Sequence, residues 1–524
     1  MQSVESAPTP ASAEPRAADA LRVLGAALGL GVLARLLLWE ADPGVNVSVW
    51  IGSLLLMLRA LAHTTRVELT GEGRIFFLPA FLFAVAVAWR DSAALVALNL
   101  LAVLVALALG AFGARTGWLR MAGVAEYLRG LFLAAVHTAT GMVFLVLGEV
   151  RWKEMPILGH SRQAAAVLRG VLLAAPLLLL FGILFVAADP VFERGIATLF
   201  RWQPENLFAS LVWIGAWSWI SAGLLRQVLL AGEPEWRPLP RHIQLSLGGT
   251  EVATVLALLN FLFGAFVLVQ LRYLFGGAAL VEATVGLSYA EYARRGFFEL
   301  VVVAALLLPV LLGLDALLRR DRLWEECRFR LLAGALVGLL FLILASAAQR
   351  MRLYTGEFGL TELRLHTSAF MVWLALVFGW LAATVLRGRR ERFAWGALWM
   401  GLGVLALLNV LNPHALIVRN NVQHASVSGR FDASYLAGLS ADAVPTLVEA
   451  LPALAPQERC RVAALLLLRA EGWAEQERDW RSWNHGAARA RQVVRENEAP
   501  LRAIACGERS AQAQPAARLS SQPH

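Results

Sequence analysis

Polar side chains within or beside long apolar runs are the first candidates for chemistry in this sequence. They are Asn99, His137, Asn260, Gln270, Glu299 and Asp315. A proton-coupled transporter usually buries a carboxylate at membrane depth, but the two acids here lie near the two ends of one apolar run. Asn260 and Gln270 are about 80° apart on a helix. We therefore expect them to join different neighbouring helices rather than to line one pore.

Two loops between apolar runs are richer in charged and aromatic residues than a linker requires. The segment 288–300 is typical of an amphipathic helix at the membrane interface. In the segment 350–366, Thr361 can cap the next helix, and a cluster of mixed charge surrounds it. That cluster could bind a lipid phosphate or a polar substrate, or it could simply solvate the loop. The residues that stand out in the two loops are Tyr292, Arg295, Tyr354, Glu357 and Arg364.

Patterns that mark an enzyme or a metal site are missing from the sequence. The acid-bearing loops around Glu40 and Asp189 are shorter than a metal-dependent glycosyltransferase needs, and neither GxSxG nor HExxH occurs. The three cysteines have no CxxC spacing. We therefore assign no catalytic residue, no cofactor and no metal. Cys460 and Cys506 could pair if the tail lies outside the cytoplasm, but we expect free thiols.

These polar groups must be positioned by a membrane-spanning bundle, because the chain consists largely of apolar runs long enough to cross a bilayer. The runs lie near 20–39, 44–62, 75–90, 92–114, 129–148, 167–188, 206–230, 251–274, 297–317, 331–349, 366–386 and 394–412. We expect an all-α polytopic bundle with 11 to 13 crossings. The predicted divisions are a disordered leader (1–19), a transmembrane domain (20–412), a small helical region (413–506) and a disordered tail (507–524). In the helical region, we expect Asp442 and Asp432 to cap helices.

Composition supports membrane residence and argues against nucleic-acid binding. The chain is 58% hydrophobic and 16% charged, and its net charge is +9. The positive charge lies in short loops between apolar runs, where retention of arginine in the cytoplasm explains it. Arginine replaces nearly all lysine, which favours a GC-rich bacterial genome. We expect a multi-pass protein of the bacterial cytoplasmic (inner) membrane, with the bilayer as its main partner.

The orientation of the bundle depends on the segment 130–148. If every run crosses, the arginines divide almost equally between the two sides, whereas a clear basic side appears if this segment does not cross. Its polar middle, which includes His137 and Thr138, would suit a re-entrant element. We expect an ordinary span whose polar groups bond to a neighbour. The alternative would place the tail outside the cytoplasm.

Several of these segments resemble a known family. They are LVQLRYLFGG (268–277), YAEYARRGFFEL (289–300), RMRLYTGEFGLTELRLH (350–366), LNPHALIVRNNV (411–422) and FDASYLAGLSADAVPTL (431–447). In order and wording they resemble bacterial multi-pass proteins described as domain of unknown function 4173, which is related to family 4153. The resemblance covers about residues 170–450 and implies an integral membrane protein without assigned chemistry. Its motif positions are Tyr292, Arg295, Tyr354, Glu357, Arg364, Asn412, Asn420, Asp432 and Tyr435.

Two functional hypotheses follow for a membrane protein whose biochemical activity the sequence does not assign. The number of spans and the polar groups in two of them favour a transporter of lipids or small molecules. The charged loops and the tail favour a non-catalytic regulator or scaffold that binds another membrane or envelope protein. A membrane-embedded transferase is a third hypothesis, for which the sequence gives little support.

Overall fold

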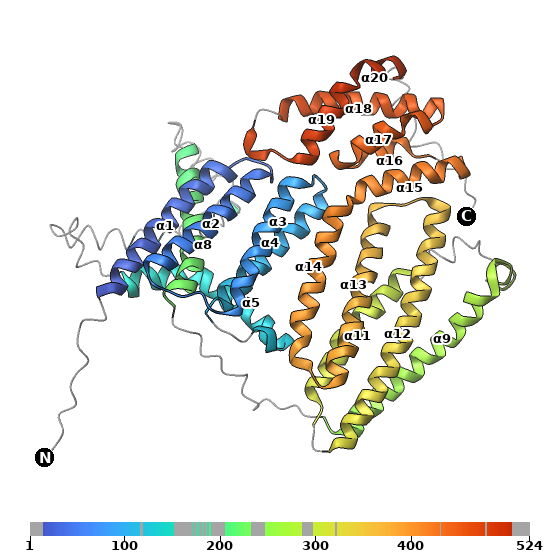
Figure 1. The fold of residues 1–524 in the computed structure, drawn as a ribbon, viewed down its shortest axis with the longest axis horizontal. Helices are drawn as coiled ribbons and strands as arrows, with labels where there is room; N and C mark the ends of the chain where they lie inside the picture. Colours follow the sequence, from blue (N-terminus) through green and yellow to red (C-terminus); the bar gives the residue numbers. More distant parts are fainter. Residues whose placement is uncertain are drawn as a thin grey trace.

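The computed structural model describes residues 14–115, 119–150, 205–231, 247–285, 297–319, 322–429, 431–476 and 479–505, together with single positions between 170 and 189. Every regular element in these ranges is a helix, apart from one isolated bridge between Leu247 and Leu318. Ten of the described helical segments are long and apolar enough to cross a membrane. The predicted all-α polytopic bundle is thus confirmed (Figure 1).

The first bundle contains helices from the N-terminal part of the chain. They are α1 (Glu14–Leu38), α2 (Val45–Thr64), α3 (Phe77–Trp89), α4 (Ala93–Gly113), α5 (Val124–Phe144) and α8 (Glu205–Leu229). Their buried faces form one hydrophobic core, which α14 joins through Ala394 and Leu402. Trp217 of α8 packs against α2 in this bundle, because its ring lies 4.6 Å from that of Trp50.

The second bundle has a separate core and lies beside the first (Figure 1). It contains α9 (Gly249–Val285), α11 (Phe297–Leu317), α12 (Leu323–Phe358) and α13 (Glu362–Thr384). The helix α14 (Phe393–Leu411) stands between the bundles, since Phe393 belongs to the second core and Leu402 to the first. At 37 and 36 residues, α9 and α12 are each about 55 Å long and exceed the hydrocarbon thickness.

The C-terminal helices form a cap over one end of both bundles (Figure 1). They are α15 (Pro413–Ser428), α16 (Ala433–Gly438), α17 (Val444–Ala450), α18 (Pro456–Gln476), α19 (His485–Glu496) and α20 (Glu498–Ile504). This cap has a hydrophobic core of its own, centred on Leu436, Leu447 and Leu466. Cys460 is disulfide-bonded, so the prediction of a free thiol at this position was wrong, while Cys327 is free and exposed. Cys506 lies outside the described residues.

Short helical turns connect or extend these helices. They are η2 (Glu72–Phe76), η3 (Leu119–Met121), η4 (Leu145–Glu149), η6 (Val385–Arg387), η7 (Arg390–Arg392), η8 (Ala441–Ala443), η9 (Leu451–Ala453) and η10 (Trp480–Ser482). Eleven of the twelve predicted runs coincide with a described helix, and the run 167–188 lies outside the described residues except for scattered positions.

Large apolar side chains on the outer faces of the membrane helices are strongly exposed. Phe132 is 67% exposed, Leu258 65% and Phe261 76%. A soluble protein rarely carries so much contiguous apolar surface. In a bilayer these apolar faces contact lipid tails, since a helix bonds its backbone polar groups internally and needs no water around it.

Candidate functional site

The junction between the cap and the membrane helices is the most polar buried region among the described residues. At its centre, the Asp442 carboxylate accepts backbone N–H bonds from Asp91 at 2.7 Å and Ser92 at 3.1 Å, in the loop between α3 and α4. Arg90 Nη1 lies 3.7 Å from the other oxygen of Asp442, whose side chain is only 1% exposed. We had expected Asp442 to cap a helix. Instead Ser440 caps η8, and Asp442 binds the membrane helices to the cap.

Asp91 returns this bond in the opposite direction. Its carboxylate accepts the backbone N–H of Ala441 at 2.8 Å, so each of two acidic side chains holds the backbone of the other's loop. Burial raises the pKa of Asp91, and the nearby charge of Asp442 raises it further, while the bond from Ala441 opposes both effects. Reciprocal bonds of this kind fix both the distance and the register of the two segments.

The cap also satisfies the carbonyl groups at the ends of two membrane helices. Asn484 donates to Val87 O at 3.0 Å and Arg90 O at 2.8 Å, at the end of α3. Arg481 donates to Leu36 O and Trp39 O at the end of α1. A third helix end is satisfied within the membrane bundle, since Arg90, which follows α3, donates to Asn409 O at 2.6 Å at the end of α14. The last carbonyls of a helix have no partner within the helix. We infer that the cap provides partners where water and lipid headgroups would otherwise compete.

A second group of polar contacts joins the cap to the start of α13. His414 is 2% exposed; its Nδ1 accepts the Ser440 N–H at 3.1 Å, and its Nε2 contacts the Glu362 carboxylate. Burial lowers the pKa of His414, and the charge of Glu362 opposes that shift. Tyr435 Oη accepts the backbone N–H of Glu362 at 2.9 Å, so both residues fix the same helix N-terminus.

Several of the predicted motif positions gather at this junction. The Arg364 guanidinium stacks 3.9 Å from the Tyr354 ring centre and donates to Phe358 O, at the end of α12. Asn412 adopts a left-handed conformation (φ 51°) between α14 and α15 and donates to Asp442 O at 3.0 Å. Asp432 caps α16, as expected, by accepting the Tyr435 N–H.

The remaining motif positions have other surroundings. Glu357 and Asn420 are exposed, whereas the neighbouring Asn421 bonds to both the N–H and the carbonyl of Leu360. Tyr292 and Arg295 lie outside the described residues. Thr361 stands at the N-cap of α13, but its side chain makes no capping bond.

Polar groups within the membrane helices pair mainly with one another. Asn99 of α4 and Asn409 of α14 form a reciprocal amide pair, with N···O distances of 2.9 and 2.8 Å. Asn260 donates to Leu332 O, and Gln270 accepts from Arg350 at 2.6 Å. Because both partners lie on α12, the expectation that Asn260 and Gln270 join different helices was wrong. These contacts hold helices together, which agrees with the expectation that the two residues do not line a pore.

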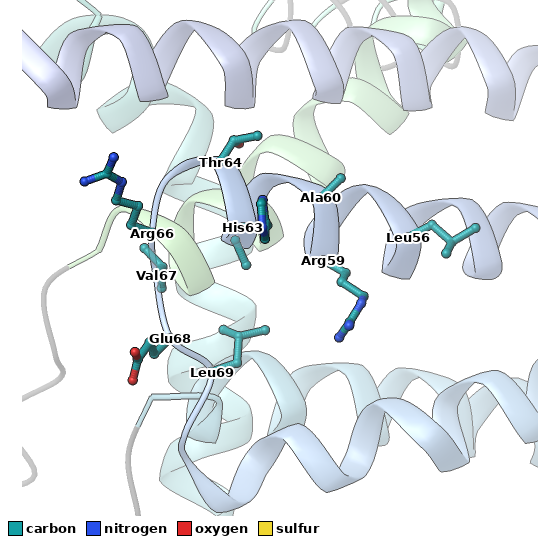
Figure 2. Close-up of a pocket in the computed structure, with 10 residues that line it drawn as sticks. Leu56, Arg59, Ala60, His63, Thr64, Arg66, Val67, Glu68 and Leu69 are labelled. Atoms are coloured by element: carbon teal, nitrogen blue, oxygen red, sulfur yellow. The ribbon is translucent and has the colours of Figure 1, made fainter.

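The opposite end of the first bundle contains a pocket of about 820 Å³ at the end of α2 (Figure 2). Its lining is mostly apolar, with Leu56 on the helix and Leu69 on the following loop. Figure 2 shows Arg59 pointing from α2 into the space, with Arg66 and Glu68 on the loop at its outer edge. One guanidinium group therefore points into an apolar pocket at a helix end, and a second one lies with a carboxylate at its edge.

Sequence reasoning missed several residues that carry the junction. Asn484 had no assigned role, although the N-cap position it occupies before the amphipathic α19 is recognisable from sequence. Arg90 was treated only as the end of a span. Among the described residues, no group of three His, Cys, Asp or Glu side chains could hold a metal ion.

Comparison with known proteins gives a family but no activity. No curated protein and no solved structure matches the chain. The match to a family model covers residues 77–450 and so includes the first bundle from α3 onward, further toward the N-terminus than the motifs alone. That model is the one described as domain of unknown function DUF4153, not the related 4173. The chain, with its ten apolar helices long enough to cross a membrane, belongs to the family described as domain of unknown function DUF4153.

Proposed function

We propose that this protein binds an anionic phospholipid in the pocket at the end of α2. The observation that carries the proposal is the position of Arg59, which points into an apolar pocket at the end of a membrane helix. Arg59 lies five residues before the end of α2 at Thr64, or about 7.5 Å along the helix axis. At that depth, a long basic side chain can extend toward the headgroup region and meet a phosphate there.

The surroundings of Arg59 suit the two parts of a lipid. Leu56 lies one turn deeper on α2 and is 70% exposed, so it offers an apolar contact to an acyl chain. Arg66 and His63 lie at the polar edge, where a headgroup would sit, and Glu68 offsets only one of the two positive charges of Arg59 and Arg66. A guanidinium recognises phosphate oxygens through two parallel N–H bonds.

A second apolar groove is less suited to an anionic headgroup. It lies between α12 and α13 near the cap, has a volume of about 450 Å³, and has one cationic residue, Arg352, in its lining. The pocket at α2 is larger and adjoins a further hollow that Arg22 of α1 lines together with Ala60 and Thr64. We therefore place the lipid at α2.

The arrangement of basic loops supports a location in the cytoplasmic leaflet. The loops at the pocket end of the helices carry many arginines, namely Arg66, Arg74, Arg115, Arg120, Arg319, Arg322, Arg387, Arg389, Arg390 and Arg392. The loops 39–44, 90–92 and 359–361 at the cap end contain a single arginine, Arg90, which is buried. Arginine-rich short loops are retained in the cytoplasm.

The contacts of α5 support the same orientation. At the start of α5, Tyr127 donates to the carbonyl of Leu119, which follows α4. At its other end, α5 continues as a π-turn to Glu149, and Glu149 pairs at 2.7 Å with Arg226 in the last turn of α8. Arg115, just after α4, donates to Ala231 O just after α8. Both ends of α5 thus lie toward the basic end. This favours the non-crossing alternative, an odd number of crossings, and a cap outside the cytoplasm.

The proposal is lipid binding rather than translocation. The polar side chains that a transport path could use, Asn99, Asn260 and Gln270, bond within the helices in the part of the chain that the structure describes. A bound lipid would instead fill a pocket at the membrane surface. The proposal keeps the lipid as the ligand, as in the first hypothesis from the sequence, and replaces transport with binding.

Native mass spectrometry of the purified protein, with added phosphatidylglycerol or phosphatidylcholine, tests this function. We expect retention of phosphatidylglycerol, with affinity about 30-fold lower in Arg59→Gln/Arg66→Gln, since each charge near the surface contributes about 1 kcal/mol. Arg389→Gln/Arg390→Gln removes the same charge from the same end in an exposed loop and should leave the affinity unchanged. Equal losses in both variants, or equal retention of the two lipids by wild type, would refute the proposal.

A further inference from the structure

The cap contains a cleft that nothing in the proposed lipid function explains. It has a volume of about 530 Å³ and lies between α18, α19 and α20. Its lining divides evenly between polar and apolar groups, with three arginines, two glutamates and one tryptophan. These residues are Glu471, Trp473, Arg491, Arg495, Glu498 and Arg502. We propose that this cleft binds a small sugar-like molecule that carries a carboxylate or a phosphate.

Arg491 is the residue on which the anion assignment rests. Its Nε is buried and has no hydrogen-bond partner. A buried N–H without a partner is costly, and an oxyanion held in the cleft by the outer N–H groups of Arg491 would offset that cost. The arrangement of one guanidinium toward two oxygens is common to carboxylate and phosphate recognition.

The other charges of the cleft favour an anion over a cation. Arg502 pairs with Glu498 at 2.6 Å, but their side chains are 72% and 49% exposed, and exposed pairs of this kind are weak. The three arginines against two glutamates leave a positive excess in the cleft. An anionic ligand would therefore be attracted to the cleft.

Trp473 adds the ring-binding part of the site. Its indole lines the cleft, and the Arg469 guanidinium lies 5.2 Å from its ring centre. Arg469 also donates to Leu439 O at 2.7 Å, so this arginine connects Trp473 to the segment that precedes Asp442. A flat aromatic ring held in place gives a sugar ring a surface to pack on.

The side of the membrane on which the cleft lies determines the compartment from which the ligand comes. The cap lies at the end opposite the arginine-rich loops, and Cys460 on α18, one of the helices that form the cleft, is disulfide-bonded. Disulfides persist in oxidising compartments and are rare in the cytoplasm. The ligand would accordingly reach the cleft from outside the cytoplasm. This site is independent of the lipid pocket, so either can fail without the other.

Isothermal titration of the full-length protein in detergent, with glucuronate, inorganic phosphate or glucose, tests the cleft. We expect binding of glucuronate, weaker binding of phosphate and none of glucose. Arg491→Gln should weaken glucuronate binding at least 10-fold, whereas Arg489→Gln, an exposed residue of the same helix outside the cleft, should bind as wild type does.

Four outcomes would overturn the proposal. Absence of binding by both anions would remove the site. An equal loss in Arg489→Gln would show nonspecific attraction to a basic helix. Binding of phosphate but not glucuronate, or no effect of Trp473→Leu on glucuronate, would remove the sugar class that Trp473 is assigned to recognise.

Discussion

Replacing Asp442 with asparagine should release the cap from the membrane helices. The carboxylate accepts two backbone N–H bonds at 2.7 and 3.1 Å, faces Arg90 at 3.7 Å, and is 1% exposed. Removing one partner of a buried charge pair costs about 3–5 kcal/mol. Because the amide keeps one acceptor oxygen, we expect the lower value, about 3 kcal/mol, which corresponds to an opening equilibrium on the order of 100-fold larger.

Hydrogen exchange followed by mass spectrometry measures this opening directly. In Asp442→Asn, peptides that cover residues 436–450 and 86–95 should exchange on the order of 100-fold faster, while peptides from α12 keep their wild-type rates. Asp432→Asn is the matched control, since asparagine caps a helix as well as aspartate does and α16 should stay protected. Exchange in Asp442→Asn within about threefold of wild type would refute the view that this carboxylate joins the two parts.

Three further predictions concern single side chains. The pKa of His414 is lowered in the folded protein, so the ring of the unfolded chain takes up a proton first as the pH falls. The stability of the cap should therefore decrease as the pH drops below 6.5. Proteolysis of the cap at pH 7.5 and 5.5 should show this loss of stability in wild type and a smaller loss in His414→Gln. Gly223→Ala would bring a Cβ to within 2.6 Å of Thr138 Cα and should destabilise the first bundle by about 1–3 kcal/mol, whereas Gly215→Ala on the same helix meets nothing within 4 Å; thermal unfolding in detergent compares them. Asn484→Ala removes two buried hydrogen bonds to α3 and the N-cap bond of α19. We expect this change to lower the stability of the C-terminal cap by about 2 kcal/mol, so that protease cleaves the cap faster than in wild type.

The membrane helices could be predicted from sequence because their signal is local. An uncharged run of about 20 residues has one physical solution in a bilayer, whatever its neighbours. The boundaries of α4 and α14 accordingly agree with the predicted runs to within a few residues. The lengths of α9 and α12 were underestimated, since their ends continue as helix after the apolar pattern stops.

The junction could not be predicted because its partners are far apart in the chain. Asp442 lies 351 positions from Asp91, and nothing in either local sequence shows that the two loops meet. The local sequence predicts that Asp442 caps a helix N-terminus, since its side chain precedes a proline-containing helical turn. The tertiary contact with the α3–α4 loop overrode it.

The choice between Asn420 and Asn421 shows what sequence alone could still have given. Ile417 and Val418 form the buried face of α15, and a residue four positions after Ile417 lies on the same face. Helical phase therefore selects Asn421, which bonds to the Leu360 loop, over the exposed Asn420. Recognising a motif located the segment but not the side chain that makes the contact.

Reporter fusions test the central claim, that the basic end faces the cytoplasm and the cap lies outside it. One fusion follows Arg390, in the loop between α13 and α14, and the other follows His524 at the end of the chain. Each site receives one reporter active only in the cytoplasm and one active only outside. We expect a cytoplasmic signal after Arg390 and an outside signal after His524. A cytoplasmic signal at His524 would contradict both the orientation and the extracytoplasmic cleft.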